Sequence, residues 1–307
     1  MKRHHLITIG LTVLMLLVSG CARQGDKSSG VVPVDGVELR YVIEGKGIPC
    51  IVTCDPVLQQ HALSDELREH FKFIFLDPRP NLPCDKPDCY DDITMDTLVE
   101  DIEQVRQALD LDKVSILGHS LCGIFALEYA RKYPEHVSRV IMVGTPPGYN
   151  PVIKNIENEY WESHASDERK LILEQNQAKL TEEELASMSP SEAKIAQYAA
   201  SVPKTWYDPM YDIRDLFEGQ RENTAGWNHV YTTMMGKYDI ENGDRITAPV
   251  FLAVGRYDFY VPDILWDSLR DITPNLTYHF FNKSGHFPHV EEQALFDSLL
   301  IEWIKGQ

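Results

Sequence analysis

The chain has 307 residues, of which 43% are hydrophobic and 25% are charged. This is the composition of a globular protein, long enough for one large domain or for one domain that carries an insertion. The formal net charge of -18 would repel the phosphate backbone of a nucleic acid, and we therefore exclude nucleic acid as a partner.

The N-terminus has the pattern of an export signal. Lys2 and Arg3 precede an apolar run over residues 6–18, which is too short to cross a bilayer as a helix of the mature protein. Two small residues and then Cys21 follow, and this ending resembles a bacterial lipobox. The resemblance implies that a signal peptide of residues 1–20 is removed and that Cys21 carries a lipid.

On this interpretation the protein is an exported bacterial lipoprotein, anchored to a membrane on the periplasmic or cell-surface side. Residues 21–33 would be a polar tether between the lipid and the folded domain. Loss of Lys2 and Arg3 changes the formal charge to -20, since -18 minus two positive charges is -20, so the acyl chain and not surface charge would hold the protein at a membrane. The alternatives are an ordinary signal peptide cut nearby and an uncleaved anchor.

Five of the six cysteines lie beyond Cys21, so they cannot all pair within one chain. Cys84 and Cys89 bracket a short loop, and the sequence leaves open whether they form a disulfide in an exported protein. Cys50 and Cys122 lie in apolar segments and are predicted to be buried small hydrophobic residues. We find no group of ligands at zinc-binding spacing, and we predict neither a metal nor a cofactor.

Beyond the tether, segments of strand and helix character alternate. Apolar, β-branched runs predict strands, and steps of three and four between apolar residues predict helices. The expected strands cover 37–44, 48–54, 72–77, 113–118, 137–144, 249–255 and 276–281, and the expected helices cover 94–109, 121–133 and 290–305. This alternation predicts an α/β fold with a mostly parallel central sheet flanked by helices.

The alternation stops between residues 147 and 246. This stretch is acidic in its first half and aromatic in its second half, has helical character, and is too long for a simple loop. We predict that residues 147–246 are an inserted helical lid over a core built from residues 34–146 and 247–307.

Ser120 stands at the junction of a predicted strand and a predicted helix, within G-H-S-L-C-G at residues 118–123. A nucleophile elbow needs small residues on both sides of the serine, because the strand and helix backbones approach closely there. The second small position is Cys122, and Gly123 comes one residue late. We predict that Ser120 is the nucleophile; the alternative is a serine that only forms a tight turn.

A nucleophilic serine needs a base, and the base needs an acid that orients it. In such a sheet these groups belong on loops at the carboxyl ends of later strands. Asp258 and His286 occupy the loops after the last two predicted strands, and the chain order Ser, Asp, His agrees with this arrangement. Asp263 is the alternative acid, and His289 is the alternative base.

The core resembles the α/β-hydrolase family over residues 34–146 and 247–305. The resemblance rests on G-H-S-L-C-G at 118–123, G-R-Y-D at 255–258 and S-G-H-F-P-H-V-E-E at 284–292. The lid segment W-Y-D-P at 206–209 is similar to the lids of hydrolases related to proline iminopeptidases. The resemblance implies an α/β-hydrolase fold with a catalytic triad of Ser120, His286 and Asp258.

One loop departs from the family pattern near the nucleophile. Relatives usually carry His-Gly after the strand at 48–54, whereas this chain has C-D-P-V at residues 54–57. That loop supplies one N–H of the oxyanion hole, and the residue after the nucleophile supplies the other. Pro56 has no N–H, so Leu121 and Val57 are the predicted donors.

A second loop reads D-P-R-P-N at residues 77–81, where relatives often have D-x-R-G-x-G. Prolines in place of glycines make the loop stiffer. We expect Asp77 and Arg79 to pair with each other as a structural contact.

We therefore predict a serine hydrolase that cleaves a carboxylic ester or amide through an acyl-enzyme, acting on a small molecule or a short peptide. One alternative is an aminopeptidase of the proline iminopeptidase type, whose acidic lid residues would hold the substrate's ammonium group. The candidates for that contact are Glu159, Glu162, Asp208 and Asp212. The other alternative, suggested by the altered oxyanion loop, is a non-catalytic, lipid-anchored binding protein on a hydrolase scaffold.

Overall fold

The computed structural model describes residues 28–83, 90–220, 223–269 and 272–306. The predicted signal peptide and the predicted lipidated Cys21 lie outside these ranges and stay predictions. Cys84 and Cys89 also lie outside them, so the question of a disulfide between them stays open. None of the helices within these ranges combines the length and the apolar character that a membrane crossing requires.

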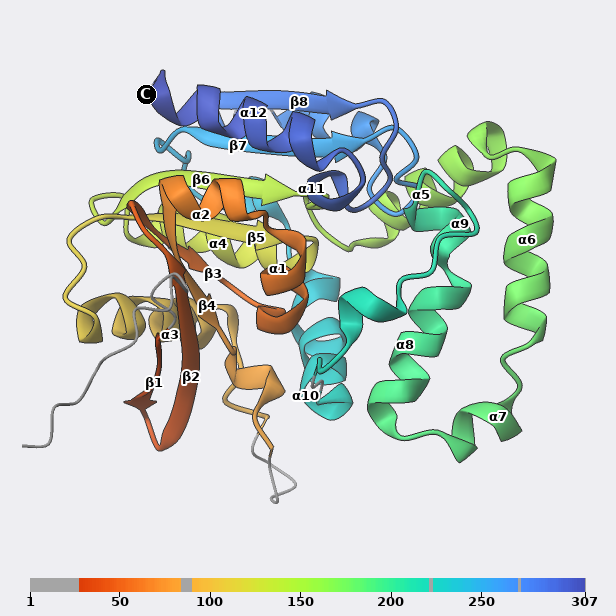
Figure 1. The fold of residues 1–307 in the computed structure, drawn as a ribbon, viewed down its shortest axis with the longest axis horizontal. Coiled ribbons are helices and arrows are strands. Elements are labelled where there is room, and N and C mark those ends of the chain that lie inside the picture. Colours follow the sequence, from red (N-terminus) through yellow and green to blue (C-terminus); the bar gives the residue numbers. More distant parts are fainter. Residues whose placement is uncertain (1–27, 84–89, 221–222, 270–271, 307) are drawn as a thin grey trace, which may run out of the picture.

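Within the described residues, an eight-stranded sheet forms the centre of the fold (Figure 1), in the order β1-β2-β4-β3-β5-β6-β7-β8. The strands are β1 (Ser28–Val34), β2 (Val37–Gly45), β3 (Ile48–Val52), β4 (Phe71–Leu76), β5 (Val114–His119), β6 (Val137–Val143), β7 (Val250–Gly255) and β8 (Leu276–Phe281). β2 pairs antiparallel with β1 and with β4, and all other neighbours are parallel. The prediction of a mostly parallel sheet is confirmed, and the seven predicted strands correspond to β2–β8.

The predicted boundary between tether and core was wrong, because residues 28–33 form most of β1. Asp35 and Gly36 join β1 to β2 with positive φ angles of 45° and 83°, as in a two-residue hairpin turn. Val32 and Val34 are buried, and the helix α3 (Met95–Ala108) packs on β1. Asp-Gly between two apolar runs is a hairpin signal that the sequence analysis did not use.

Helices cover both faces of the sheet. Side chains alternate along β4: Phe73 and Phe75 face the layer of α2 (Asp65–His70) and α12 (Gln293–Lys305), whereas Ile74 and Leu76 face α3 and α4 (Leu121–Lys132). Both sets are fully buried, as expected of a sheet covered on both sides. Two short helices follow strands of the sheet along the chain: α1 (Pro56–Ala62) comes after β3, and α11 (Pro288–Glu291) comes after β8.

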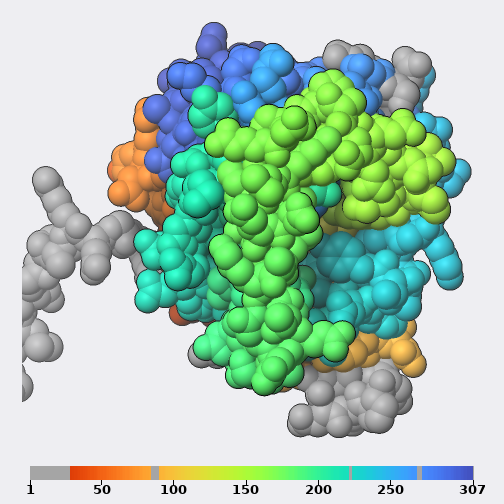
Figure 2. All heavy atoms as spheres, turned by 90° about the vertical axis from the view of Figure 1, so that its right-hand side faces the viewer, coloured from red at the N-terminus to blue at the C-terminus, as the bar shows by residue number. Residues whose placement is uncertain are grey.

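Residues 147–246 form a helical insertion between β6 and β7. Its helices are α5 (Pro151–His164), α6 (Asp167–Ala178), α7 (Glu182–Ser187), α8 (Pro190–Ala200), α9 (Val202–Thr205) and α10 (Thr224–His229), with short 3-10 and π turns after α9 and α10. Figure 1 shows α5–α9 at the end of the sheet toward which the arrowheads of β6 and β8 point. Figure 2 looks onto this lid, and the green residues of α5–α7 cover the centre of that face.

Arg169 of α6 bonds to the backbone of another part of the lid. Its buried guanidinium donates to the carbonyls of Pro203, Trp206 and Tyr207 at 2.8, 2.7 and 2.6 Å. The same group lies 5.2 Å from the ring centre of Tyr257, on the loop after β7. One cation therefore links α6, the end of α9 and the core.

The lid backbone is also bonded to the two loops that follow β7 and β8. The Phe259 N–H donates to the Lys204 carbonyl at 2.9 Å, and the His286 N–H donates to the Thr205 carbonyl at 2.6 Å. At Gly285 a Cβ atom would collide with the Thr205 carbonyl, so only glycine allows this approach. The lid thus holds the backbone of both loops.

Glu291 of α11 adds a further contact between lid and core. Its carboxylate accepts from the Tyr207 N–H and from the Gly285 N–H, both at 2.6 Å. Burial raises the pKa of Glu291 to about 8, although the two N–H donors act in the opposite direction.

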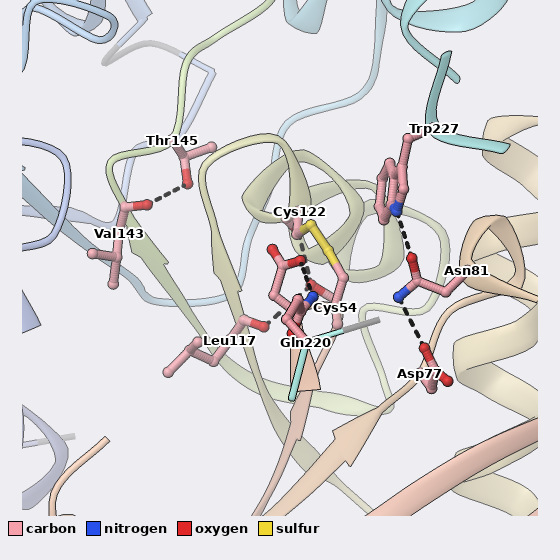
Figure 3. Close-up of a disulfide and its surroundings, with 11 residues drawn as sticks. Cys54, Asp77, Asn81, Leu117, Cys122, Val143, Thr145, Gln220 and Trp227 are labelled. Carbon is pink, nitrogen blue, oxygen red and sulfur yellow. Dashed lines mark hydrogen bonds between the residues drawn. A yellow bond between two sulfur atoms is a disulfide. The ribbon is translucent and has the colours of Figure 1, made fainter. Parts of the chain in front are cut away.

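The loop after β4 anchors the other end of the lid. The Trp227 indole N–H donates to Asn81 at 2.6 Å, and the Asn81 amide donates to Asp77 at 2.9 Å (Figure 3). The predicted pairing of Asp77 with Arg79 was wrong, because Arg79 pairs with the buried Asp101 of α3 at 2.5 and 2.9 Å. A second carboxylate on a helix far along the chain could not be found from local spacing.

We predict that Arg169→Ala lowers the free energy of unfolding by about 3 kcal/mol, because three buried carbonyls lose a charged donor. Arg169→Lys should recover only part of this loss, since one ammonium group cannot reproduce the planar geometry. Urea unfolding measures both. Arg214→Ala is the control, because that side chain is 74% exposed and a surface ion pair contributes little; equal effects of the two alanine variants would contradict the anchor.

Glu291 should make stability depend on pH. Its pKa is raised from 4.5 to about 8 in the folded state, so the folded protein binds more protons than the unfolded chain between these values. Stability contributed by this group therefore falls as pH rises from about 4.5 to 8. We expect the Tm of Glu291→Gln minus that of the unsubstituted protein to increase between pH 5 and pH 8.5. A difference that stays constant would show that Glu291 does not titrate in this window.

Candidate active site

Ser120 occupies a sharp turn between β5 and α4. Its backbone has φ 53° and ψ -132°, a strained conformation for a residue with a side chain. A Cβ atom at Gly118 would collide with the Cys122 carbonyl, and one at Gly123 would collide with the Thr145 side chain. Gly118 therefore permits the close approach of β5 and α4 that a nucleophile elbow needs, and Gly123 lets α4 approach Thr145, which follows β6.

Asp258 and His286 form a buried hydrogen-bonded pair. His286 Nδ1 lies 2.7 Å from Asp258 Oδ2, and the Asp258 side chain is fully buried. The other carboxylate oxygen accepts from the Tyr260 and Val261 N–H groups at 3.0 and 2.9 Å. Two backbone donors thus orient the acid, which in turn orients the imidazole.

The imidazole lies beside the elbow. The Ser120 N–H donates to the Val143 carbonyl at 2.8 Å, and a Cβ atom on the next residue, Gly144, would lie 3.0 Å from His286 Nδ1. His119, next to the serine, has its ring centre 4.7 Å from that of His286 and its Nε2 2.9 Å from the His286 carbonyl. The structure therefore brings the three predicted residues to one place, where Ser120 and His286 line the same cavity.

The alternative acid and base lie elsewhere. Asp263 begins a 3-10 turn (Asp263–Leu269), whereas Asp258 is the carboxylate that bonds His286. His289 is buried in α11 and is absent from the cavity lining. Burial lowers the pKa of His289 to about 3, so it stays neutral. Burial also holds the pKa of His119 well below 6.5, consistent with a packing role.

A cavity of about 290 Å³ opens over Ser120. Core loops form its floor and the lid forms its walls, with mostly aromatic and apolar side chains. The lining residues are Asp55, Leu58, His119, Ser120, Leu121, Cys122, Pro146, Tyr149, Lys154, Glu157, Tyr198, Ser201, Thr205, Trp206, Ile213, Phe217, Gln220, Trp227, Tyr231, Tyr260, Val261, His286 and Phe287. Such a lining suits a small, largely apolar ligand.

The acidic lid residues named from the sequence do not line this cavity. Glu159, Glu162, Asp208 and Asp212 are all exposed. The lid acid that does line it is Glu157, which is buried and pairs with Lys154 at 2.7 Å. Burial raises the pKa of Glu157, and Lys154 acts against this rise.

Tyr149 is another cavity residue that the sequence analysis missed. It follows β6, and its side chain lines the cavity together with Ser120. Burial raises the pKa of this phenol well above 10, so it stays protonated as a donor or acceptor. The sequence indicates this role only through the position of Tyr149 after β6. Loops that follow parallel strands lie at the same edge of the sheet, so a residue after β6 can lie near Ser120.

The predicted oxyanion donors differ in their placement. Leu121 begins α4 and lines the cavity. Val57 lies within α1, one residue past Pro56, and is not part of the lining. Asp55 does line it, with a left-handed backbone of φ 53° and ψ 51°. Aspartate tolerates this region better than most residues, which is a weak signal that sequence analysis could have used.

Cys54 and Cys122 form a disulfide, so the prediction of Cys122 as a free hydrophobic residue was wrong. Cys50 is buried and free, as predicted. Ligand atoms of Cys54, Asp55 and Cys122 lie within 4.8 Å of one another, but the disulfide occupies both sulfurs and leaves no thiolate for a metal.

Comparisons with known proteins agree with this fold. The sequence model of the α/β hydrolase fold family matches residues 54–293. The AB hydrolase superfamily protein YclE of Bacillus subtilis is 28% identical over 278 residues, which cover 90% of this chain and 98% of that protein. A proline iminopeptidase of Lactobacillus delbrueckii subsp. lactis is 27% identical over 226 residues, which cover 70% of this chain and 73% of that enzyme.

A solved structure shares the fold. The proline iminopeptidase-related protein of Thermus thermophilus superposes with a TM-score of 0.68 and 19% identity, over 90% of this chain and 96% of that one. At this identity the likeness concerns architecture alone. Together with a family match that spans most of the sequence, it shows that the chain belongs to the α/β hydrolase fold family.

Proposed function

We propose that the protein is a serine hydrolase that cleaves a carboxylic ester through an acyl-enzyme on Ser120. The observation that carries this proposal is the buried Asp258–His286 pair beside a serine held in a strained turn. A strained nucleophile, an imidazole and an orienting carboxylate at one cavity are the parts that acyl transfer requires.

In the proposed reaction, His286 Nε2 takes the Ser120 proton as Oγ attacks the acyl carbonyl. Asp258 keeps the other ring proton on Nδ1 and stabilises the imidazolium. The imidazolium then protonates the leaving alcohol, and the acyl group stays on Oγ. A water molecule, deprotonated by His286, releases the acid and restores the serine.

We assign the oxyanion hole to the N–H groups of Leu121 and Asp55, with Asp55 in place of Val57. Both residues line the cavity, and they flank the Cys54–Cys122 disulfide in the two chain segments that it joins. Backbone donors fixed before the reaction stabilise the charge that develops on the carbonyl oxygen.

An aminopeptidase is the second candidate, because proline iminopeptidases are among the relatives. Such an enzyme needs a carboxylate for the substrate's ammonium group. Glu157 is already paired with Lys154, and Asp55 receives a hydrogen bond from the Gln220 amide at 3.3 Å. The aromatic lining and the paired state of Glu157 favour an ester.

Ser120→Ala should abolish covalent labelling by a fluorophosphonate probe and lower ester hydrolysis at least ~1000-fold, because the nucleophile is lost. In-gel fluorescence and initial rates measure the two effects. Ser163→Ala on the exposed side of α5 is the control and should label normally. Equal labelling of the Ser120→Ala variant would refute the mechanism and favour a binding protein on a hydrolase scaffold.

We expect p-nitrophenyl esters of short acids to show higher kcat/KM than aminoacyl-p-nitroanilides, prolyl-p-nitroanilide included. Glu157→Gln should then change ester turnover little. If an anilide is the better substrate and its kcat/KM falls at least ~tenfold in Glu157→Gln, a charge contact worth about 1.4 kcal/mol is lost, and the aminopeptidase assignment replaces the ester one.

A further inference from the structure

The oxyanion loop, defined here as Cys54–Val57, is joined covalently to the helix that follows the nucleophile. β3 and β5 are neighbours in the sheet, with Val52 opposite Leu117, so the residues just beyond the two strands meet. The Cα atoms of Cys54 and Cys122 are 6.1 Å apart, a usual separation for a disulfide. Figure 3 shows the bond between the end of β3 and the first turn of α4.

Both cysteines fall where this chain departs from its family's pattern. Cys54 is in the loop where relatives carry His-Gly, and Cys122 replaces the second glycine of the elbow. Each departure taken alone suggests a weakened site. The disulfide links the two departures, because Cys54 and Cys122 can form this bond only when both cysteines are present.

Hydrogen bonds also restrain the oxyanion loop, among them the one from the Gln59 N–H to the Asp55 carbonyl at 2.9 Å. Thr53 donates its N–H to the Leu117 carbonyl at 3.0 Å and its hydroxyl to the Cys122 carbonyl at 2.9 Å. Beyond Thr53, the lid residue Gln220 reaches Asp55 and the Leu58 N–H at 3.3 and 3.4 Å, the long end of hydrogen-bond distances. The disulfide is the covalent restraint next to the left-handed Asp55.

We propose that the Cys54–Cys122 disulfide is a positioning element of the oxyanion hole, and that the hydrolase works at full rate only while this bond is formed. The bond keeps the Asp55 N–H at a fixed place relative to the Leu121 N–H. This inference rests on the serine hydrolase function proposed above. A dithiol can undo it: the disulfide takes up two electrons and two protons to give two thiols, and the dithiol becomes a cyclic disulfide.

The Thr53 bonds survive reduction, so the loop should loosen without leaving the site. We expect kcat for the ester substrate to fall about tenfold, less than the ~100- to 1000-fold cost of losing a donor outright. KM should stay within about twofold, because the cavity that binds substrate is intact and only an interaction made in the transition state is weakened.

The test compares the full chain in its oxidised state with the same protein treated with dithiothreitol. Thiol alkylation and peptide mass spectrometry establish the state of Cys54 and Cys122 in each sample. The rates of ester hydrolysis and of fluorophosphonate labelling at Ser120 are measured at 25 °C, with the Tm alongside. Removal of the dithiol and reoxidation should restore kcat.

Two variants distinguish the effect of reducing this disulfide from effects at other cysteines. Cys122→Ala should have the low kcat from the start and show no response to dithiothreitol. Cys50→Ala, which removes the free cysteine of β3, should keep both the full rate and the response. A response that persists in Cys122→Ala would come from another disulfide and would overturn the proposal.

Other results would also overturn it. One is an unchanged kcat after both cysteines have become alkylatable, even if the Tm falls, because the bond would then only stabilise the fold. Another is a fully active protein in which Cys54 and Cys122 are alkylated without reduction. If the oxidised protein neither labels at Ser120 nor hydrolyses any ester, the serine hydrolase function itself fails, and this inference fails with it.

Discussion

The strained backbone of Ser120, with φ 53° and ψ -132°, is the constraint on which the rest of the site depends. A residue with a side chain costs about 1–3 kcal/mol in such a sparsely populated region, so the neighbouring structure must hold it there. The Val143 carbonyl accepts the Ser120 N–H, and the glycine at 118 lets the Cys122 carbonyl approach. Because the turn is fixed against β6, the glycine at 144 can admit the His286 ring beside it.

The lid is part of this site, because its backbone is bonded to the loops that carry Asp258 and His286. The carbonyls of Lys204 and Thr205 accept the N–H groups of Phe259 and His286, which are the neighbour of the acid and the base itself. Without these bonds, the N–H groups of Phe259 and His286 would need other hydrogen-bond acceptors. The insertion therefore fixes the loops that carry Asp258 and His286 and also lines the cavity over Ser120.

The fold and the convergence of the three candidate catalytic residues could be predicted, because both follow from the order of the elements along the chain. Parallel strands bring their following loops to one edge, so Ser120, Asp258 and His286 could be placed together without knowing any contact. The Cys54–Cys122 bond could not, because it depends on which strands become neighbours. The buried face of α5 was not predicted either. Glu157 and Glu159 are two residues apart, which corresponds to a rotation of about 200° along a helix, so Glu157 is buried whereas Glu159 is exposed.

The altered oxyanion loop first suggested an idle site, and the structure gives a physical argument against that reading. A fully buried Asp258 carboxylate costs solvation energy, and the turn at Ser120 stores strain. A binding protein needs neither the buried carboxylate nor the strained turn, and single substitutions that remove such unfavourable features are common. The loop itself has gained restraints: an aspartate that tolerates the left-handed region, a proline at the first position of α1 and a bond to the elbow. These restraints support the proposed oxyanion hole, which would be held in place by other means than the glycine pattern.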